Sequence, residues 1–239
     1  MGNISEEKNL YICINCGNTV SRLYSKYAKS VKCLKCEKCH NVADKYIEFE
    51  PVIILIDAIL LSEKAVRHIL YNRDFKFLWK LSTVLLLLES FALWRKKRFE
   101  QFEASQNEIV QEKGFYICCL ENIIDYIVIT FLLLLVSMPR RKLFFNTSTF
   151  SEFAVTLMKA VTVANFSKFF LLPLMVWREN TTLIGSSIHN LLVMSYYILC
   201  LISVFSVITR LNKLQSLVIV LPIYFAKKYL ILWLSNFIE

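Results

Sequence analysis

Glycine, proline and histidine are all scarce in this chain. Its 239 residues include four glycines, four prolines and three histidines. Loops that cradle the phosphates of a nucleotide need glycines at fixed positions, so this composition argues against a nucleotide site. The sequence also shows no pattern that pairs a nucleophile with a base, and no His-Asp motif of an acyltransferase. We therefore expect a protein that is not an enzyme.

Polar surface is also in short supply. Hydrophobic residues make up 56% of the chain, and its mean hydropathy is +0.49. A soluble domain of this length buries one core and still needs a polar surface, which this composition does not supply beyond residue 75. The apolar residues there come in blocks of about 18–25, the length of a helix that crosses a bilayer. The sequence predicts a membrane protein.

The start of the chain lacks the apolar core of a signal peptide. Met1–Leu10 is polar and acidic, so we expect residues 1–9 to be a disordered leader and internal helices to drive insertion. The formal net charge of +9 is spread between the apolar blocks. Such scattered Lys and Arg residues are typical of segments that flank membrane helices. No nucleic-acid partner is expected.

Eight cysteines are present, and five of them lie in the stretch from Cys13 to Cys39. Four of the five follow the pattern C-x2-C-x19-C-x2-C. Two CxxC turns can place four thiolates around a tetrahedral zinc ion, and a spacer of this length suits a zinc ribbon. We predict that residues 10–46 form a small β zinc-ribbon head with one structural Zn²⁺. The predicted ligands are Cys13, Cys16, Cys36 and Cys39.

Alternatives to this ligand set remain open. Cys33 precedes Cys36 by the same spacing as Cys36 precedes Cys39, and His40 could also bind a metal. We favour Cys36 and Cys39 and interpret Cys33 as a spare thiol. A redox-active CxxC is the competing interpretation, although redox chemistry does not need two pairs at ribbon spacing.

Residues 47–74 predict a linker helix at the membrane interface. Pro51 suits the first position of a helix over 51–72, and the apolar first half of that helix is too short to cross a bilayer. It would lie in the interface or against the membrane bundle. Asp57, Lys64 and His68 recur at steps of seven and four residues, so they would share one stripe.

This stripe, together with Arg67, is a candidate contact surface for a lipid headgroup or a membrane partner. The alternative is a set of salt bridges that hold the helix to the head. On the first interpretation, Arg67→Ala should spare zinc binding and impair function, because it removes a charge-assisted contact to a ligand.

Residues 75–239 predict an all-α polytopic bundle of about five transmembrane helices. The first candidate is the weakest, because Lys80 and Glu89 interrupt it. The five candidates are residues 77–94, 115–138, 153–177, 186–208 and 214–235.

Three charged residues inside these candidates are further site predictions. Glu121 and Asp125 lie four residues apart on one helix face, and Lys168 lies in the middle of its span. Charges within a membrane are costly and often functional. The carboxylates could bind a lipid headgroup or a partner, or pair with Lys159 or Lys168. They could also simply extend to water at a helix end.

The distribution of Lys and Arg predicts a cytosolic head. With five crossings, the basic loops at Pro139–Lys142 and Arg210–Lys213 lie on the same side as the head. The cluster Arg95–Arg98 would then be lumenal, which disagrees with the rule.

The cysteine pattern and the residues that follow it resemble the Arv family of endoplasmic-reticulum membrane proteins. The resemblance covers residues 11–72, the whole Arv homology domain, and departs from the family at Val66 and in the extra Cys33. The residues that carry it are Tyr11–Gly17, Leu23, Tyr24, Tyr27, Cys36–Cys39, Asp44–Asp57, Ala65–His68 and Asn72.

This resemblance implies a role in lipid homeostasis. The family is associated with sterol movement out of the endoplasmic reticulum, with sphingolipid balance and with early assembly of glycosylphosphatidylinositol (GPI) anchors. The implied partners are membrane lipids (sterol, phospholipid or GPI precursor) and GPI-assembly subunits. An alternative function is that of a non-catalytic accessory subunit of a glycosyltransferase complex that builds GPI anchors.

Overall fold

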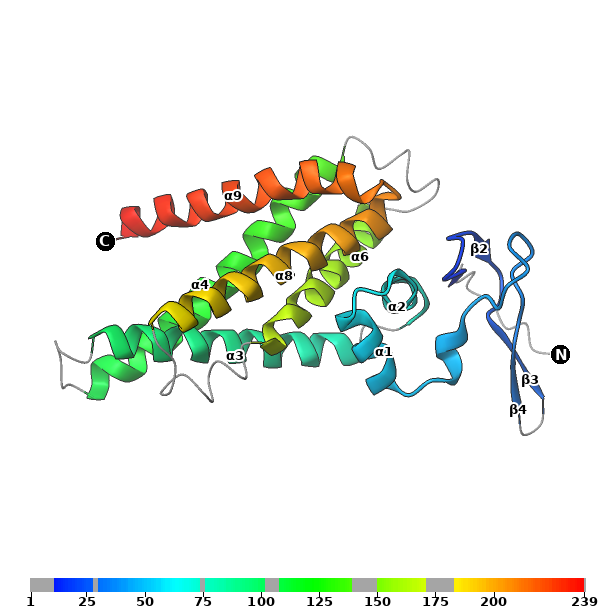
Figure 1. Cartoon of the computed structure of the whole chain (residues 1–239), viewed down its shortest axis with the longest axis horizontal. Helices are drawn as coiled ribbons and strands as arrows, with labels where there is room; N and C mark the ends of the chain where they lie inside the picture. The colour runs from blue at the N-terminus through cyan, green and yellow to red at the C-terminus, as the bar shows by residue number, and fades with distance from the viewer. Residues whose placement is uncertain are drawn as a thin grey trace. The chain divides into compact units, whose positions relative to one another are not determined.

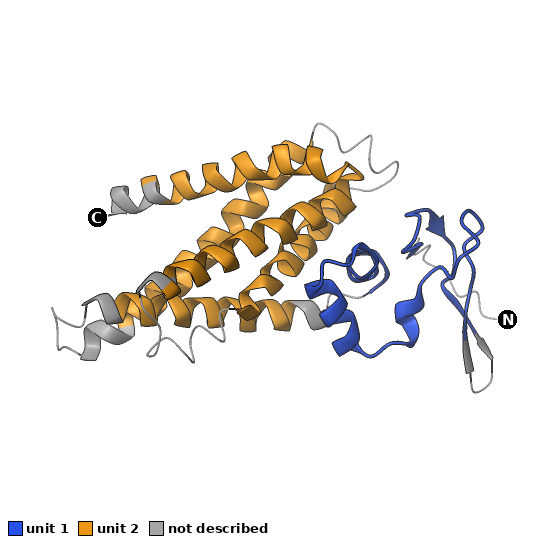
Figure 2. Ribbon diagram, in the orientation of Figure 1, with its two compact units in different colours: residues 1–74 blue, residues 75–239 orange. Residues whose placement is uncertain are grey.

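The computed structural model describes residues 11–27, 30–73, 76–101, 108–138, 150–170 and 183–238. The chain divides into two compact units, Met1–Asp74 and Phe75–Glu239 (Figure 2). The predicted leader, residues 1–9, lies outside the described residues.

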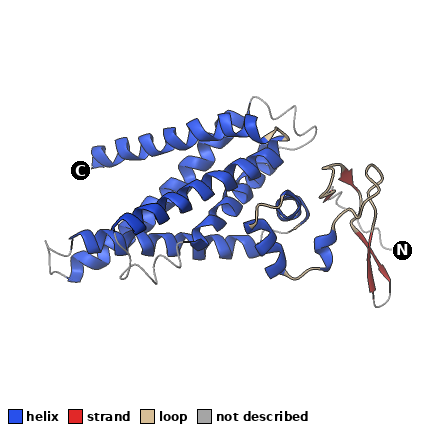
Figure 3. Cartoon of the chain, in the orientation of Figure 1, coloured by secondary structure: helices blue, strands red, loops and turns tan. Residues whose placement is uncertain are grey.

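The first unit begins with two short antiparallel hairpins (Figure 3). Strand β1 (Tyr11–Ile12) pairs with β2 (Thr19–Val20), and β3 (Tyr24–Tyr27) pairs with β4 (Ser30–Cys33). An isolated bridge joins Lys35 to Val42. Each CxxC pair therefore sits in the turn of a hairpin-like segment, as the predicted ribbon requires. A small core forms between the two turns, from buried Cys13, Leu23, Cys36 and Ala43.

The linker that follows is not one helix, so the prediction of a helix over 51–72 is wrong. A 3-10 turn η1 (Lys45–Glu48) leads to α1 (Pro51–Ile59), then to α2 (Glu63–Arg67) and to a π-helical turn η2 (His68–Asn72). Asp57 lies on α1, whereas His68 lies on η2. The predicted stripe therefore does not exist as one helix face.

The break follows from how α1 ends. Leu61 has a positive φ of 60°, its N–H donates to the Ala58 carbonyl, and the Ser62 N–H donates to the Asp57 carbonyl. These two bonds form a Schellman motif, whose left-handed residue is usually glycine. Leucine stands in that position here, so the sequence carries no stop signal. Ser62 then occupies the cap position before α2.

Helix α1 presents an apolar outer face. Ile54 and Ala58 are buried within the unit, whereas Val52, Ile56 and Leu60 are half or more exposed. A run of exposed large apolar side chains on one helix is unusual for a surface in contact with water. The face has the character that a helix in the membrane interface needs.

All the regular secondary structure described in the second unit is helical (Figure 1). Helix α3 packs against α4, α4 packs against α6 and α9, and α8 packs against α6 and α9. The 3-10 segment η4 continues from α6 and contacts α3 and α8. The elements are α3 (Lys76–Gln101), α4 (Glu108–Ser137), α6 (Phe150–Ala164), η4 (Asn165–Phe170), α8 (Leu183–Thr209) and α9 (Lys213–Ile238).

Three helices are long and apolar enough to cross a membrane: Lys113–Ser137 in α4, Ser187–Thr209 in α8 and Lys213–Ile231 in α9. They correspond to three of the five predicted spans. The predicted span over 153–177 is interrupted, because α6 has 15 residues and then tightens into a 3-10 segment. A bundle of five transmembrane helices is therefore not confirmed; three helices long and apolar enough to cross a membrane agree with the prediction of a membrane protein.

Candidate metal centre and a charged cavity

The four predicted ligand cysteines come together in the head. Their sulfur atoms all lie within 4.8 Å of one another. The Sγ atoms of Cys13 and Cys39 are 3.8 Å apart, and those of Cys16 and Cys36 are 3.7 Å apart. A tetrahedral ion with metal–sulfur bonds of about 2.3 Å places its sulfurs about 3.8 Å apart. The four thiols therefore have the geometry to hold one metal ion with no open position.

The two CxxC turns share one backbone geometry. In each, the first cysteine accepts a hydrogen bond from the residue four positions later, and that later residue has a positive φ. It is Gly17 (φ 71°) in the first turn and His40 (φ 57°) in the second. The bonds are Gly17 N–H to the Cys13 carbonyl and His40 N–H to the Cys36 carbonyl, both 2.9 Å. His40 therefore takes the left-handed backbone conformation that ends the second turn, and its side chain is exposed. It is not one of the four clustered ligands.

The thiols of the centre differ in acidity. Burial raises the pKa of Cys13 to about 12. The backbone N–H of Cys39 lowers the pKa of Cys36 to about 7. A metal ion binds thiolates, not thiols. The lowered pKa of Cys36 therefore favours metal binding, whereas binding to Cys13 must displace the proton of its thiol.

Cys33 lies apart from this cluster. Its sulfur is 3.2 Å from a carboxylate oxygen of Glu48 and 3.5 Å from the Asp44 carbonyl oxygen. Burial first, and then Glu48, raise the pKa of Cys33 to about 11. Cys33 is thus held as a protonated thiol that donates to oxygen, which fits its interpretation as a spare thiol.

Asp44 ties the head to the linker. Its side chain is fully buried, and three donors surround it: the Tyr46 N–H at 2.9 Å, His68 Nδ1 at 2.6 Å and Asn72 Nδ2 at 2.6 Å. Asn72 also exchanges two hydrogen bonds with the backbone of Ile12 in β1. One carboxylate therefore links η1, η2 and, through Asn72, the first hairpin.

Arg67 makes a second link between linker and head. Its Nη1 donates to the carbonyl oxygens of Ile14 and Asn15, at 2.9 and 3.0 Å. These two residues are the middle of the first CxxC turn. Arg67 also lies 3.6 Å from Glu63, one turn earlier on α2. The guanidinium thus holds the backbone between two metal ligands.

The predicted contact surface of four residues is largely engaged inside the first unit. Asp57 accepts a hydrogen bond of 2.7 Å from the Tyr46 hydroxyl, and Arg67 and His68 make the contacts given above. Lys64 is exposed. Of the two interpretations that the sequence left open, these contacts favour the one in which the residues hold the linker to the head.

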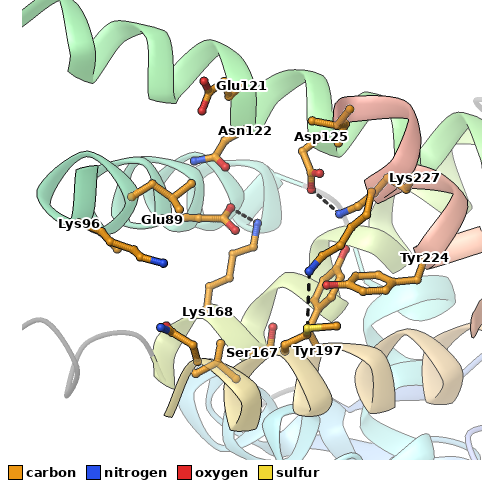
Figure 4. Close-up of a pocket in the computed structure, with 17 residues that line it drawn as sticks. Glu89, Lys96, Glu121, Asn122, Asp125, Ser167, Lys168, Tyr197, Tyr224 and Lys227 are labelled. Atoms are coloured by element: carbon orange, nitrogen blue, oxygen red, sulfur yellow. Dashed lines mark hydrogen bonds and ion pairs between the residues drawn. The ribbon is translucent and has the colours of Figure 1, made fainter. Parts of the chain in front are cut away.

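The three charged residues predicted in the spans are brought to one cavity of the second unit. The cavity has a volume of about 460 Å³, and Glu121, Asp125 and Lys168 all line it (Figure 4). Each has a partner that sequence reasoning missed. Glu121 pairs with Lys97 at 2.8 Å, Asp125 pairs with Lys227 at 2.7 Å, and Lys168 pairs with Glu89.

Pairing with Lys159 or Lys168 was one of the alternatives that the sequence left open for the two α4 carboxylates; the structure pairs them with Lys97 and Lys227 instead. Their partners come from α3 and α9, which pack on α4. Lys227 is a charge inside an apolar span, which is by itself a signal of a buried partner. Glu89 is likewise a charge inside a candidate span, although it was interpreted only as a reason to doubt that residues 77–94 cross the membrane. Asp44 and Asn72 were visible as part of the family motif, but no pattern assigned them a role.

Loss of one cluster cysteine should release the metal. We expect Cys36→Ser to abolish zinc binding and unfold the head, because three thiolates and a hydroxyl cannot replace a closed four-thiolate site. Cys33→Ser is the matched control and should keep the metal. Zinc content of the purified full chain, measured by elemental analysis, decides between the two. A metal-free wild type, or zinc retained in Cys36→Ser, would contradict the assignment.

Loss of the Arg67 guanidinium should loosen the first CxxC turn. Arg67→Ala removes two charge-assisted hydrogen bonds, of about 1.5–3 kcal/mol each, so a chelator should extract zinc faster than from the wild type. Arg67→Lys should restore part of the retention, since one ammonium cannot copy the planar guanidinium. Lys64→Ala, on the same helix, is the control. Wild-type zinc retention in Arg67→Ala with lost function would instead favour the interpretation of Arg67 as a ligand contact.

Residues 12–201 of the chain match the Arv1-like family. The human protein ARV1 is 30% identical over 181 residues, which cover 72% of this chain and 64% of the human protein. Bovine ARV1 is 33% identical over 183 residues, covering 72% of this chain and 61% of the bovine protein. The arv1 homolog of Dictyostelium discoideum is 26% identical over 186 residues, covering 70% and 74%.

The chain thus spans slightly less than two thirds of the mammalian proteins that it matches. No solved structure matches it. The family match extends well past the cysteine head into the helical unit and covers most of the sequence. The head, the linker and much of the helical unit therefore all fall within the match, and the chain belongs to the Arv1-like family.

Proposed function

We propose that this chain is a membrane protein of lipid homeostasis in the endoplasmic reticulum. It would aid intracellular sterol transport and the metabolism of sphingolipids and GPI-anchor precursors. The observation that carries the proposal is the family match over residues 12–201, joined to three helices that can cross a membrane. Its partners would be membrane lipids: sterol, phospholipid or GPI precursor.

The metal of the head is proposed to be a structural Zn²⁺. Four thiolates at tetrahedral spacing suit zinc, and a head with a core of a few residues needs the ion to fold. When bound, zinc would be held by Cys13, Cys16, Cys36 and Cys39. The closed set leaves no position for a water or a substrate, which supports a structural rather than a catalytic role.

A second candidate function is that of a non-catalytic accessory subunit of a GPI-anchor glycosyltransferase complex. The exposed apolar face of α1 favours it, because a membrane-bound partner could bury Val52, Ile56 and Leu60. On this candidate the chemistry resides in another chain, and this protein stabilises or positions the assembly.

Rescue of cells that lack their own Arv1-like protein tests the proposed function. We expect the wild-type chain to restore sterol distribution, sphingolipid levels and GPI-anchored protein at the cell surface, and Cys36→Ser to fail. Restoration of none of these at matched expression would overturn the proposal. Purification from the rescued cells separates the two candidates: bound lipid without a protein partner supports the first, and stoichiometric glycosyltransferase subunits support the second.

The head is proposed to face the cytosol. The basic loop residues around Arg210 and Lys213 fall on the cytosolic side in that orientation if the chain crosses five times. In sealed microsomes, protease should therefore remove an N-terminal tag without detergent. A tag that survives until detergent is added would place the head in the lumen.

A further inference from the structure

The cavity of the second unit is charged, although helices that can cross a membrane form much of its wall. It is lined from α3, α4, η4, α8 and α9 (Figure 4). Asn190 of α8 and Lys228 of α9 lie within the stretches of those helices that are apolar enough to cross a membrane. Polar and charged side chains in such stretches are costly and often functional.

The charges of the cavity do not balance. Glu89, Glu121 and Asp125 line it, and each is paired with one lysine. Two further lysines of the lining, Lys96 and Lys228, have no carboxylate within salt-bridge distance among the described residues. The described lining thus has four lysines and three carboxylates, and because Lys97 pairs with Glu121 from outside the lining, two lysines keep no carboxylate partner among the described residues.

The surroundings of Lys228 do not neutralise it. Its ammonium lies 3.7 Å from the Met194 sulfur and 5.5 Å from the ring centre of Tyr224. A thioether is a weak acceptor, and an aromatic face attracts a cation without cancelling its charge. An unpaired cation next to an apolar medium is costly, and an anion that entered the cavity would lower that cost.

An unused donor points to the same kind of ligand. Ser167 of η4 lines the cavity and is fully buried, and its hydroxyl makes no hydrogen bond within the described residues. Buried hydroxyl groups are normally satisfied, so an orphan at a cavity wall marks a place for a missing partner. Ser167 directly precedes Lys168 in the sequence, and Lys168 forms an ion pair with Glu89.

Apolar side chains complete the wall. Leu93 of α3, Val193 of α8 and Ile231 of α9 line the cavity beside the charged groups. A ligand that fills such a site needs an anionic part for the two lysines and an apolar part for these residues. An anionic membrane lipid has both.

We propose that this cavity binds the phosphate-bearing headgroup of an anionic membrane lipid. Lys96 and Lys228 pair with the phosphate, and the Ser167 hydroxyl donates to one of its oxygens. The two ion pairs of Lys168 and Lys227 stay intact and hold the walls in place. The inference rests on the proposed function only in taking the anion from a lipid; the charge excess and the orphan hydroxyl do not depend on it.

Binding to the purified full chain in detergent tests this site. The probes are short-chain phosphatidic acid, short-chain phosphatidylcholine and inorganic phosphate, titrated by native mass spectrometry. We expect the wild type to bind phosphatidic acid about tenfold or more tightly than phosphatidylcholine. The double variant Lys96→Gln/Lys228→Gln should lose about tenfold or more, and Ser167→Ala about threefold.

Two variants control for charge and for folding. Lys228→Arg keeps the positive charge and should bind phosphatidic acid within about threefold of the wild type. Lys80→Gln removes an exposed lysine of α3 that does not line the cavity, and should change nothing. Both should keep the elution volume and zinc content of the wild type.

Three results would overturn the proposal: equal affinity of the double variant and the wild type for phosphatidic acid, equal affinity of the wild type for the two lipids, or inorganic phosphate bound as tightly as phosphatidic acid. The rescue assay separates this proposal from the proposed function. A chain that rescues cells but does not bind phosphatidic acid disproves the lipid site alone. A chain that binds the lipid through Lys96 and Lys228 but fails to rescue disproves the function alone.

Discussion

The buried carboxylate of Asp44 is the constraint on which the first unit depends. A buried carboxylate is costly unless its oxygens are satisfied, and here the donors come from Tyr46, His68 and Asn72. The donors of His68 and Asn72 lie on η2, which follows the head in sequence, so the carboxylate is fully satisfied only when the linker folds back on the head. Asn72 extends the link to β1 through two bonds with Ile12. The linker is therefore part of the folded head, not a tether.

The metal centre and this polar network support each other. Arg67 donates to the carbonyl groups between Cys13 and Cys16, so the helix that follows the head fixes the turn that presents two ligands. The ligands in turn fix the two hairpins, whose core is too small to hold them. The metal turns, the carboxylate and the arginine therefore form one cooperative unit that extends from the first cysteine to Asn72.

The parts of the structure that sequence reasoning recovered have strong local signals. The paired CxxC turns predicted the cluster of four thiols, and long apolar blocks predicted α4, α8 and α9 as membrane helices. The prediction of one continuous linker helix was wrong because Leu61 occupies the left-handed position that ends α1, where glycine is usual. The partners of Glu121 and Asp125 could not be predicted, because pairing across a helical bundle depends on which helices pack together. Periodicity within one helix does not reveal that packing. Glu89 and Lys227 could have been found as charges in apolar spans, although not as partners of particular residues.

The same ion pairs that hide charge in the second unit also determine how its helices pack. In lipid, apolar side chains gain little by facing one another, so polar contacts carry more of the specificity between helices. Lys97–Glu121 joins α3 to α4, Lys168–Glu89 joins η4 to α3, and Asp125–Lys227 joins α4 to α9. In the pairs of Lys168 and Lys227 the lysine is largely buried, so loss of the carboxylate would leave a buried charge without compensation. Lys97 and Glu121 are about half exposed, and their pair contributes less. All three carboxylates of the described cavity lining are therefore used in packing the bundle, while two of its four lysines, Lys96 and Lys228, have no carboxylate partner there. The remaining positive charge is free to act on something other than the protein itself.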